Sequence, residues 1–345
     1  MALSGESMRA IIMENIGKPR VLKVTRIRKP APAPGQALVK VYATSVNPCD
    51  LHLRSGRLII RKPMPHILGA DLAGEIEALA DDVQGWQIGD RVFACAEGLG
   101  REINGSYAEY CAVPADQLIP LPDELDYQSA VAAGASFADA HLALLSIGKL
   151  KKADRIVVRG AAGGVGASAI QIARARGAKV IAICRGQFAA ELHEIGADVV
   201  LEDIGDDLVR QVKVATDERG ASLVLHCREE LNLAESLAML GYGGRLVIAG
   251  ALRKPQARLD AMDLYLRNLT ILGSYGAIKP KDVESLLKNL AKGAYKPLVD
   301  QVMPLSQARK AHRKMEKEPG FGKIVLAPDS ILEAEQKPAN WIPIE

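Results

Sequence analysis

One pattern limits the possible folds of this chain more than any other. Between residues 155 and 274, short runs rich in β-branched residues alternate with helical segments. The runs are RIVVRG, AKVIAIC, ADVVLE, SLVLHC, GRLVIAG and LTILGS. The segments between them, such as GASAIQIARARGAK, carry apolar residues at helical spacing. Strands that alternate with helices predict a doubly wound, parallel α/β sheet, and nearly continuous apolar strands are typical of a sheet covered on both faces.

The first of these strands runs into a glycine-rich turn, which a helix and a second strand follow. Small residues let the backbone turn tightly and approach a pyrophosphate, and the amides at the helix N-terminus then meet its charge. The last glycine, Gly166, lets the helix lie close to the strand. This strand–turn–helix–strand context separates a dinucleotide-binding turn from an ordinary tight turn. The predicted cofactor-binding residues of the turn are Ala162, Gly163, Gly164, Val165 and Gly166.

The end of the second strand indicates which dinucleotide binds. An acidic residue there would hydrogen-bond the ribose hydroxyl of NAD, but the chain reads Ala182-Ile183-Cys184-Arg185-Gly186 and has no carboxylate until Glu191. The planar guanidinium of Arg185 suits a 2′-phosphate. We therefore favour NADPH over NADH, and the alternative is that Arg185 merely lies on a solvated edge.

The remainder of the chain predicts a second domain. Residues before 127 are β-rich and punctuated by proline, whereas residues 128–148 are rich in Ala and Leu and are predicted to be helical. After residue 274, two helical segments and the strand GKIVLAP are expected to return to the first region. We therefore predict a dinucleotide-binding domain over residues 127–274 and a β-rich substrate domain over residues 1–126 and 275–345.

Composition excludes several classes of protein. The 44 basic and 41 acidic side chains leave a formal charge of +3, without the basic surplus of a nucleic-acid-binding protein. We expect no membrane span, because no uninterrupted apolar run reaches the ~18 residues that a span needs, and no signal peptide. The five cysteines form no CxxC pair, which disfavours a disulfide framework and favours a reducing, cytoplasmic environment.

The motifs AAGGVGASAIQIARARGAKV, VNPCDLHLRSG, GGRLVIAG and GKIVL together resemble the zinc-free quinone oxidoreductase branch of the medium-chain dehydrogenase/reductase superfamily. The resemblance extends from about Met8 to Ala327. It implies a GroES-like catalytic domain, built from both chain ends, around a Rossmann domain, with a cleft between them and a homodimeric assembly. Gly250, which ends GGRLVIAG, joins the expected cofactor-binding residues.

The resemblance also bears on metal content. In zinc-dependent relatives, the metal is held by a cysteine in the segment that matches Ser45–Asp50 and by a His-Glu pair after the glycine that matches Gly69. Here the cysteine position is Asn47 and the pair reads Ala70-Asp71. Zinc favours Cys and His donors, so we predict no catalytic metal. An unrelated metal site that uses Cys49, His52 and His66 is the alternative.

Three residues are the catalytic candidates. Asn47 matches the family's Asn-Pro-x-Asp segment along the nicotinamide, so its amide is expected to donate to a substrate oxygen and, with Asp50, to contact the cofactor; the alternative is a turn residue. His52 could deliver a proton near neutral pH, or could be a partly exposed histidine without a role. Asp139 falls where the family has a threonine that faces the nicotinamide. It would accept from the carboxamide or act as an acid with a raised pKa, unless it faces His141 or solvent.

Reduction without a Lewis acid suits an acceptor that is already electrophilic. We therefore expect an NADPH-dependent reductase of a quinone or an α,β-unsaturated carbonyl, an enone or enal. One alternative is an alcohol or aldehyde dehydrogenase, which the stretch LTILGSYGAIKPKDVESLLKNLAKG resembles more closely. A third possibility is an NADPH-binding protein with negligible turnover. Arg54 is expected to be structural and to pair with Asp50 or Asp71.

Overall fold

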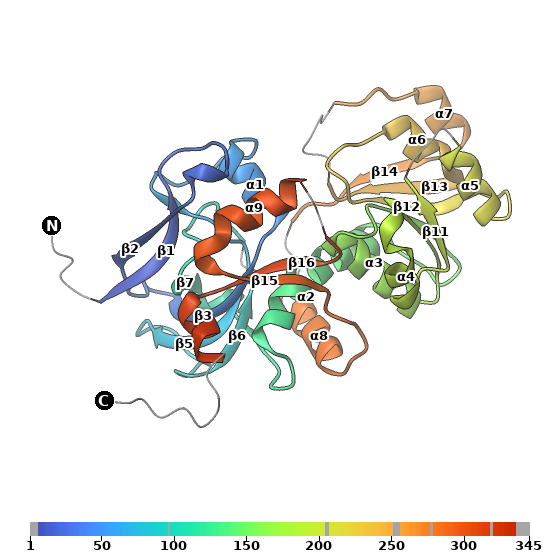
Figure 1. Cartoon of the computed structure of the whole chain (residues 1–345). Coiled ribbons are helices and arrows are strands. Elements are labelled where there is room, and N and C mark those ends of the chain that lie inside the picture. The colour runs from blue at the N-terminus through green and yellow to red at the C-terminus, as the bar shows by residue number, and fades with distance from the viewer. Residues whose placement is uncertain are drawn as a thin grey trace. The chain divides into compact units, whose positions relative to one another are not determined.

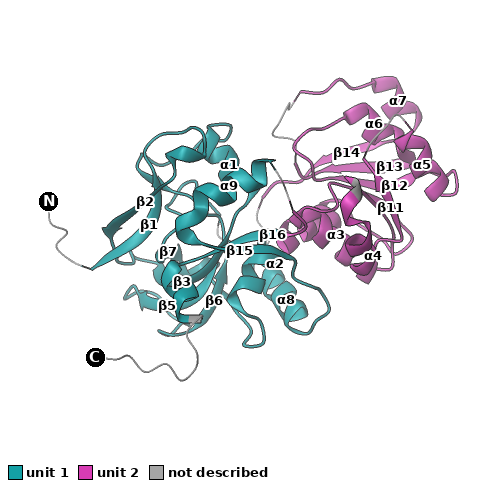
Figure 2. Cartoon of the chain, viewed as in Figure 1, with its two compact units in different colours: residues 1–135, 280–319, 323–345 teal, residues 136–279, 320–322 magenta. Residues whose placement is uncertain are grey.

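The computed structural model describes residues 6–95, 97–203, 207–250, 256–276, 279–317 and 320–335. The chain divides into two compact units (Figure 2). Unit 1 comprises residues 1–135, 280–319 and 323–345, and unit 2 comprises residues 136–279 and 320–322. The first crossing between the units therefore falls inside helix α2 (Tyr127–His141), whereas the sequence boundary was placed just before that helix.

Unit 2 contains, among the described residues, a six-stranded parallel sheet in the order β11-β10-β9-β12-β13-β14 (Figure 1). The strands are β9 (Arg155–Arg159), β10 (Lys179–Cys184), β11 (Val199–Glu202), β12 (Ala221–His226), β13 (Leu240–Ile248) and β14 (Thr270–Gly273). The helices are α3 (Gly164–Ala175), α4 (Ala189–Glu194), α5 (Leu208–Ala215), α6 (Leu233–Ala238) and α7 (Ala261–Leu266). The predicted doubly wound sheet is confirmed, and its strand order reverses between β9 and β12, where such sheets bind ligands.

The centre of this sheet explains the apolar strand sequences. Val157 of β9 lies opposite Ile181 of β10 and Val224 of β12, and all three side chains are fully buried. Together with neighbours on α5 and α6, they form one hydrophobic cluster. Because helices cover both faces of the sheet, the side chains on both faces of each central strand are buried and apolar. The alternation of polar and apolar residues that is typical of a half-exposed strand is therefore absent.

Unit 1 is built mainly from strands. Its described part holds a three-stranded sheet in the order β2-β1-β4, and a larger sheet in the order β15-β16-β3-β5-β6-β8, with β7 paired to β3. The strands are β1 (Ser7–Met13), β2 (Lys23–Arg28), β3 (Gln36–Ser45), β4 (His66–Ile67), β5 (Leu72–Leu79), β6 (Arg91–Ala94), β7 (Tyr110–Pro114), β8 (Ile119–Pro120), β15 (Val299–Pro304) and β16 (Lys323–Ala327). Besides α2, the helices of this unit are α1 (Pro48–Ser55), α8 (Pro280–Ala291), α9 (Ala308–Lys317) and α10 (Asp329–Glu335).

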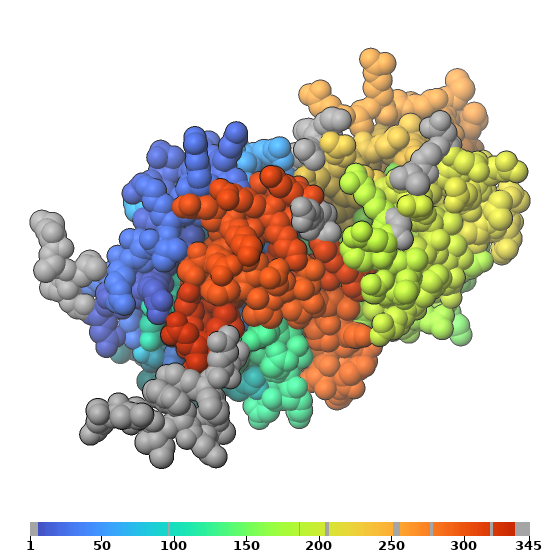
Figure 3. Space-filling model, viewed as in Figure 1, coloured from blue at the N-terminus to red at the C-terminus, as the bar shows by residue number. Residues whose placement is uncertain are grey.

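The two ends of the chain meet within unit 1. Strand β16 pairs antiparallel with β3, with Val325 opposite Ser45 and Leu326 opposite Thr44. Ala308 and Ala311 of α9 share a hydrophobic cluster with Met8 and with other residues of the N-terminal region. The orange-red residues of the C-terminal part accordingly lie against blue N-terminal residues in Figure 3.

One described helix reaches the length and apolar composition of a membrane span, contrary to the sequence expectation. It is formed by α2 and the π-helical segment Leu142–Ile147 that follows it. Within its most apolar window, 61% is buried inside the structure, which is typical of the core helix of a globular protein. Short 3₁₀ turns complete the described elements, at Pro19–Val21, Ala115–Gln117, Gly186–Phe188 and Leu305–Gln307.

Candidate active site

The glycine-rich turn of unit 2 presents the N-terminus of α3. Gly160 follows β9 with a positive φ of 85°, and Gly163 is the N-cap of α3 in an extended conformation. The first backbone bond of the helix runs from the Ala167 N–H to the Gly163 carbonyl, at 2.9 Å. The amides of residues 164–166 therefore precede the hydrogen-bonded helix, and amides in that position bind phosphate.

The glycines of this turn differ in what a side chain would meet. A Cβ added at Gly166 would lie 2.3 Å from the Gly160 carbonyl oxygen and 2.9 Å from the Ala161 Cα. At Gly163 the nearest atom would be the Gly160 oxygen at 3.5 Å, an ordinary contact. Gly166 is thus required for the close packing of α3 on β9. Gly163 is exposed and leaves room in front of the helix.

The other predicted cofactor residues of unit 2 lie around Arg228, which the sequence analysis did not single out. Both Gly160 and Gly250 face Arg228. A Cβ added at Gly160 would lie 3.0 Å from the Arg228 Cγ, and one added at Gly250 would lie 3.2 Å from the Arg228 carbonyl oxygen. Burial, followed by the positive charges of Arg159 and Arg185, lowers the pKa of Arg228. We call the group Gly160, Arg185, Arg228 and Gly250 the nucleotide edge, because each follows the carboxyl end of a parallel strand.

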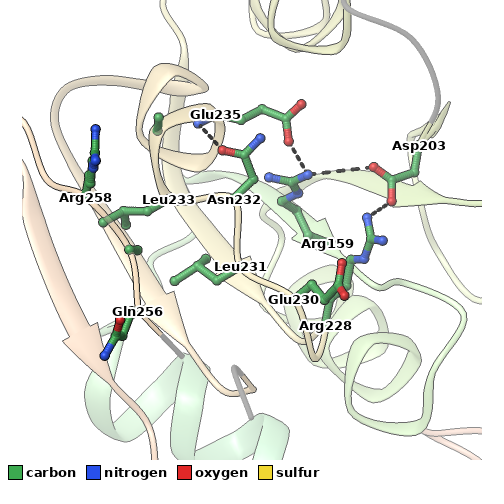
Figure 4. A pocket seen from close by; sticks show the side chains of 12 residues that line it. Arg159, Asp203, Arg228, Glu230, Leu231, Asn232, Leu233, Glu235, Gln256 and Arg258 are labelled. Carbon is green, nitrogen blue, oxygen red and sulfur yellow. Dashed lines mark hydrogen bonds and ion pairs between the residues drawn. The ribbon is translucent and has the colours of Figure 1, made fainter. Parts of the chain in front are cut away.

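A pocket of about 480 Å³ opens beside the nucleotide edge (Figure 4). Its lining residues are Arg159, Asp203, Arg228, Glu230, Leu231, Asn232, Leu233, Ala234, Glu235, Gln256, Ala257 and Arg258. Asp203 forms an ion pair with Arg228 and lies 3.7 Å from the Arg159 guanidinium. Arg159 also pairs with Glu235. Asp203 directly follows ADVVLE, and Arg228 directly follows SLVLHC. Their place after two predicted strands was the available signal.

Asp139 lies on the unit 2 part of α2 and is exposed. The argument that this carboxylate would be costly to bury therefore does not apply. Its negative charge acts on Cys227, just past β12, whose pKa rises to about 12 mainly because the thiol is surrounded by protein. Asp139 is thus close to the end of β12, and its role toward a nicotinamide stays a prediction.

In unit 1, Asp50 is the centre of a buried hydrogen-bond network at the start of α1. One carboxylate oxygen accepts from the Asn47 N–H at 2.8 Å and from the Tyr107 hydroxyl at 3.2 Å, and the other accepts from the Gly69 N–H at 3.1 Å. Asp50 has no exposed surface. Burial, with a further contribution from Asp71, raises the pKa of Asp50 to about 7, although Lys323 and the amide donors oppose this.

Asn47 connects Asp71 to a buried lysine. Its amide nitrogen donates to Asp71 at 2.9 Å, and its amide oxygen accepts from Lys323, which also donates to the Val46 carbonyl at 3.0 Å. Asp71 accepts in addition from the backbone and hydroxyl of Ser45, at 2.8 and 2.5 Å. Both polar atoms of the Asn47 amide therefore have partners within unit 1. The predicted contacts of Asn47 with substrate and of Asn47 and Asp50 with cofactor stay predictions.

His52 lies on α1 and is only 1% exposed, so the alternative of a partly exposed histidine is not what the structure has. Its role as a proton donor stays a prediction. The expected partner of Arg54 was wrong. Instead of Asp50 or Asp71, the Arg54 guanidinium pairs with Glu316 on α9 and donates to the Gly17 carbonyl at 2.9 Å.

Tyr107 and His312 extend the Asp50 network, and no sequence pattern pointed to either residue. The Tyr107 hydroxyl lies 3.2 Å from His312 Nε2 as well as 3.2 Å from Asp50. Burial and the nearby Arg54 charge lower the pKa of His312 to about 3, so the imidazole is neutral. When Tyr107 donates to Asp50, His312 Nε2–H donates to Tyr107.

The raised pKa of Asp50 predicts a pH-dependent stability. A carboxyl whose pKa is 3.8 unfolded and about 7 folded stabilises the fold fully below pH 3.8 and loses that contribution as the pH rises to about 7. The expected slope is about 1.4 kcal/mol per pH unit. Asp50→Asn should flatten this segment of the free energy of unfolding, measured by urea denaturation at several pH values. The exposed Asp116→Asn serves as control; an unchanged slope in Asp50→Asn would contradict the assignment.

Comparison with known proteins places the chain in a family. The model of the alcohol dehydrogenase GroES-like domain matches residues 33–123, and that of the zinc-binding dehydrogenase matches residues 164–292. Quinone oxidoreductase from Rattus norvegicus is 30% identical over 94% of this chain and 99% of its own length. The chain belongs to the medium-chain dehydrogenase/reductase superfamily.

Solved structures agree with this assignment. A structure titled as an NAD-dependent alcohol dehydrogenase has a TM-score of 0.86 and 31% identity, and covers 93% of this chain and 99% of its own. A mycobacterial protein solved with NADPH has a TM-score of 0.84 and 28% identity, with coverages of 93% and 100%. The predicted Rossmann and GroES-like architecture is confirmed, and this medium-chain dehydrogenase/reductase is an oxidoreductase that binds a pyridine nucleotide.

The residues of this family member do not fit a catalytic zinc ion. At the positions expected to hold the metal stand an amide, Asn47, and one carboxylate, Asp71, that already accepts three hydrogen bonds. The ammonium of Lys323 bonds to the same amide. Zinc prefers thiolate and imidazole donors, and a neighbouring cation opposes its binding. Among the described residues, no three His, Cys, Asp or Glu side chains are grouped to hold a metal ion. His66, in particular, hydrogen-bonds the Gly100 carbonyl at 2.8 Å.

Proposed function

We propose that this chain is a zinc-independent, NADPH-dependent oxidoreductase that transfers hydride to a quinone or an α,β-unsaturated carbonyl. The observation that carries the proposal is the Asn47–Asp71–Lys323 network, which fills the expected metal position with groups that do not suit zinc. The exposed Arg185, at the end of β10 and close enough to Arg228 to act on its pKa, supports the choice of NADPH.

In the proposed reaction, backbone amides and side chains of this chain bind the cofactor and supply a proton. The reduced nicotinamide supplies the hydride when it is bound. The backbone amides of residues 164–166 would hold the pyrophosphate of the cofactor, and the Arg185 guanidinium would hold its 2′-phosphate. A quinone or enone needs no Lewis acid, since its conjugated double bond is already electrophilic, and the developing oxyanion then takes a proton from His52 or water.

The test is a substrate panel. The purified protein is mixed with NADPH and with quinones, enones, enals or aldehydes, and nicotinamide absorbance is followed with and without a strong zinc chelator. We expect oxidation with quinones or enones, unchanged by the chelator, and no stoichiometric zinc by elemental analysis. Loss of activity on chelation would overturn zinc independence. Tight NADPH binding without turnover of any substrate would overturn the enzymatic assignment.

A second candidate function is alcohol or aldehyde dehydrogenase activity. It is favoured by the NAD-dependent alcohol dehydrogenase structure, with its TM-score of 0.86, and by the alcohol dehydrogenase of Geobacillus stearothermophilus, which is 28% identical. The same panel separates the two functions, because turnover confined to aldehydes, or to alcohols with the oxidised cofactor, would support this candidate alone.

His52→Ala tests the proton donor. We expect kcat to fall by about 10²-fold, in the range of general acid catalysis, while the dissociation constant of NADPH changes little. His52→Gln is the matched variant, because it keeps a hydrogen-bonding group of similar length in the buried site. Equal turnover of His52→Ala and the parent protein would remove His52 from the mechanism.

A further inference from the structure

Two guanidinium groups stand at the nucleotide edge, and only one of them has a carboxylate partner in the described residues. Arg185 is exposed and forms no ion pair with the described part of the chain. Arg228 lies above the first glycine of the phosphate turn, since its Cγ would be 3.0 Å from a Cβ on Gly160. The two charges are close enough for Arg185 to lower the pKa of Arg228. Two positive charges at one edge of the sheet, beside the phosphate turn, favour the binding of an anion.

Asp203 holds Arg228 in its present position. The ion pair joins a carboxylate that is 10% exposed to a guanidinium that is 30% exposed, so the arginine side remains accessible (Figure 4). Glu230 and Glu235 also act on Arg228 through their charges, but both are weaker contributors than the two neighbouring arginines. Glu235 pairs with Arg159, and Asp203 forms the ion pair with Arg228.

We propose that Arg228 is a second residue that selects NADPH over NADH, and that Asp203 is the counter-charge which the 2′-phosphate of the cofactor replaces. This inference rests on the proposed use of NADPH. A phosphate monoester carries nearly two negative charges and three acceptor oxygens, so it competes well against one carboxylate for a planar guanidinium. A cofactor without that phosphate leaves the Arg228–Asp203 pair in place. Its affinity is therefore independent of Arg228.

Asp203 also allows an opposite result, which makes the proposal sharp. A carboxylate at the end of the second strand of such a sheet is the usual acceptor for the ribose hydroxyls of NAD, and Asp203 follows the neighbouring strand β11. If Asp203 had that role, its loss would weaken NADH binding. If it only restrains Arg228, its loss leaves NADH binding unchanged and strengthens NADPH binding, because a repulsive charge beside the phosphate is gone.

The experiment compares dissociation constants, measured by calorimetry on the full chain, for NADPH, NADH, 2′,5′-ADP and 5′-AMP. Arg228→Met should raise the dissociation constants of NADPH and 2′,5′-ADP at least tenfold and change those of NADH and 5′-AMP less than twofold. Arg228→Lys should lose less, since it keeps the charge without the planar fork. Asp203→Asn should strengthen NADPH several-fold. Arg219→Met is the control, because this exposed arginine precedes the same strand, at its opposite end.

Each outcome decides one claim. An Arg228→Met variant with an unchanged ratio of NADPH to NADH affinity overturns the role of Arg228. Weaker NADH binding in Asp203→Asn overturns the role of Asp203 as a counter-charge. A parent protein that binds 5′-AMP as tightly as 2′,5′-ADP and prefers NADH overturns the proposed cofactor itself. If Arg228→Met fails to fold, as judged by circular dichroism, Arg228→Lys and Asp203→Asn still decide between the two roles.

Discussion

Gly166→Ala is expected to lower both the stability of unit 2 and its affinity for a dinucleotide. The new Cβ would stand 2.3 Å from the Gly160 carbonyl oxygen, so α3 has to move away from β9. Overpacking of this kind costs about 1–3 kcal/mol of the free energy of unfolding. Because the same helix presents the amides of residues 164–166 to the phosphates, its displacement should also raise the dissociation constant of NADPH more than tenfold.

Gly163→Ala is the matched control for the stability part of this prediction. Its Cβ would meet only the Gly160 oxygen at 3.5 Å, and its φ of −76° suits alanine. We expect stability within about 0.5 kcal/mol of the parent protein, as for substitutions that create no clash. The methyl group would nevertheless lie on the open side of the turn, where we expect it to weaken the binding of NADPH. Calorimetric titration and urea denaturation measure the two effects, and parent-like behaviour of Gly166→Ala in both would contradict the packing argument.

Lys323→Met is expected to have the largest effect on unit 1. Lys323 is 4% exposed, and its ammonium is the cation that acts on Asp50 in opposition to Asp71. Methionine has a similar length but no charge, so it removes the cation that acts on Asp50 and deprives the Asn47 amide oxygen of its donor. Leaving a buried acceptor without its donor costs about 1–3 kcal/mol, and more where a charged group is involved.

The loss should depend on pH. Lys323 lowers the pKa of Asp50, so without it this pKa rises above about 7, further from the unfolded value of 3.8. A raised folded pKa removes stability as the pH rises, so the deficit of Lys323→Met should be smaller at pH 5 than at pH 8. Urea denaturation at both pH values measures it. Lys288→Met, on the exposed face of α8, is the control; a deficit equal to that of the control would disprove the role of Lys323.

The sequence pattern was sufficient to predict the backbone of unit 2. The parallel sheet and the turn at residues 160–166 follow from local features, namely apolar runs, glycines and helical spacing. Gly166 and Arg185 were found because each lies at a fixed offset from a recognisable strand. Such signals are local, so a single sequence carries them.

Side-chain partners across long separations were not predictable in this way. Arg54 pairs with Glu316, which is 262 positions away, and no periodicity connects the two. Lys323 was noted only as part of a strand, because nothing local indicates that its ammonium is buried against Asn47. Helical spacing alone also did not show that Asp139 is exposed on α2, and its role toward the nicotinamide stays a prediction.

The position of β16 has a consequence for how the protein is made. Unit 2 occupies one continuous stretch, residues 136–279, apart from three later residues, whereas unit 1 needs β16 to pair with β3. During synthesis, residues 136–279 of unit 2 therefore leave the ribosome before β16, which unit 1 needs to complete its sheet. Contacts between such distant segments form slowly, because a long loop must close first. Until β16 is made, the edge of β3 that pairs with it stays unpaired. Chaperones that shield such edges should therefore associate with nascent chains shorter than about 320 residues.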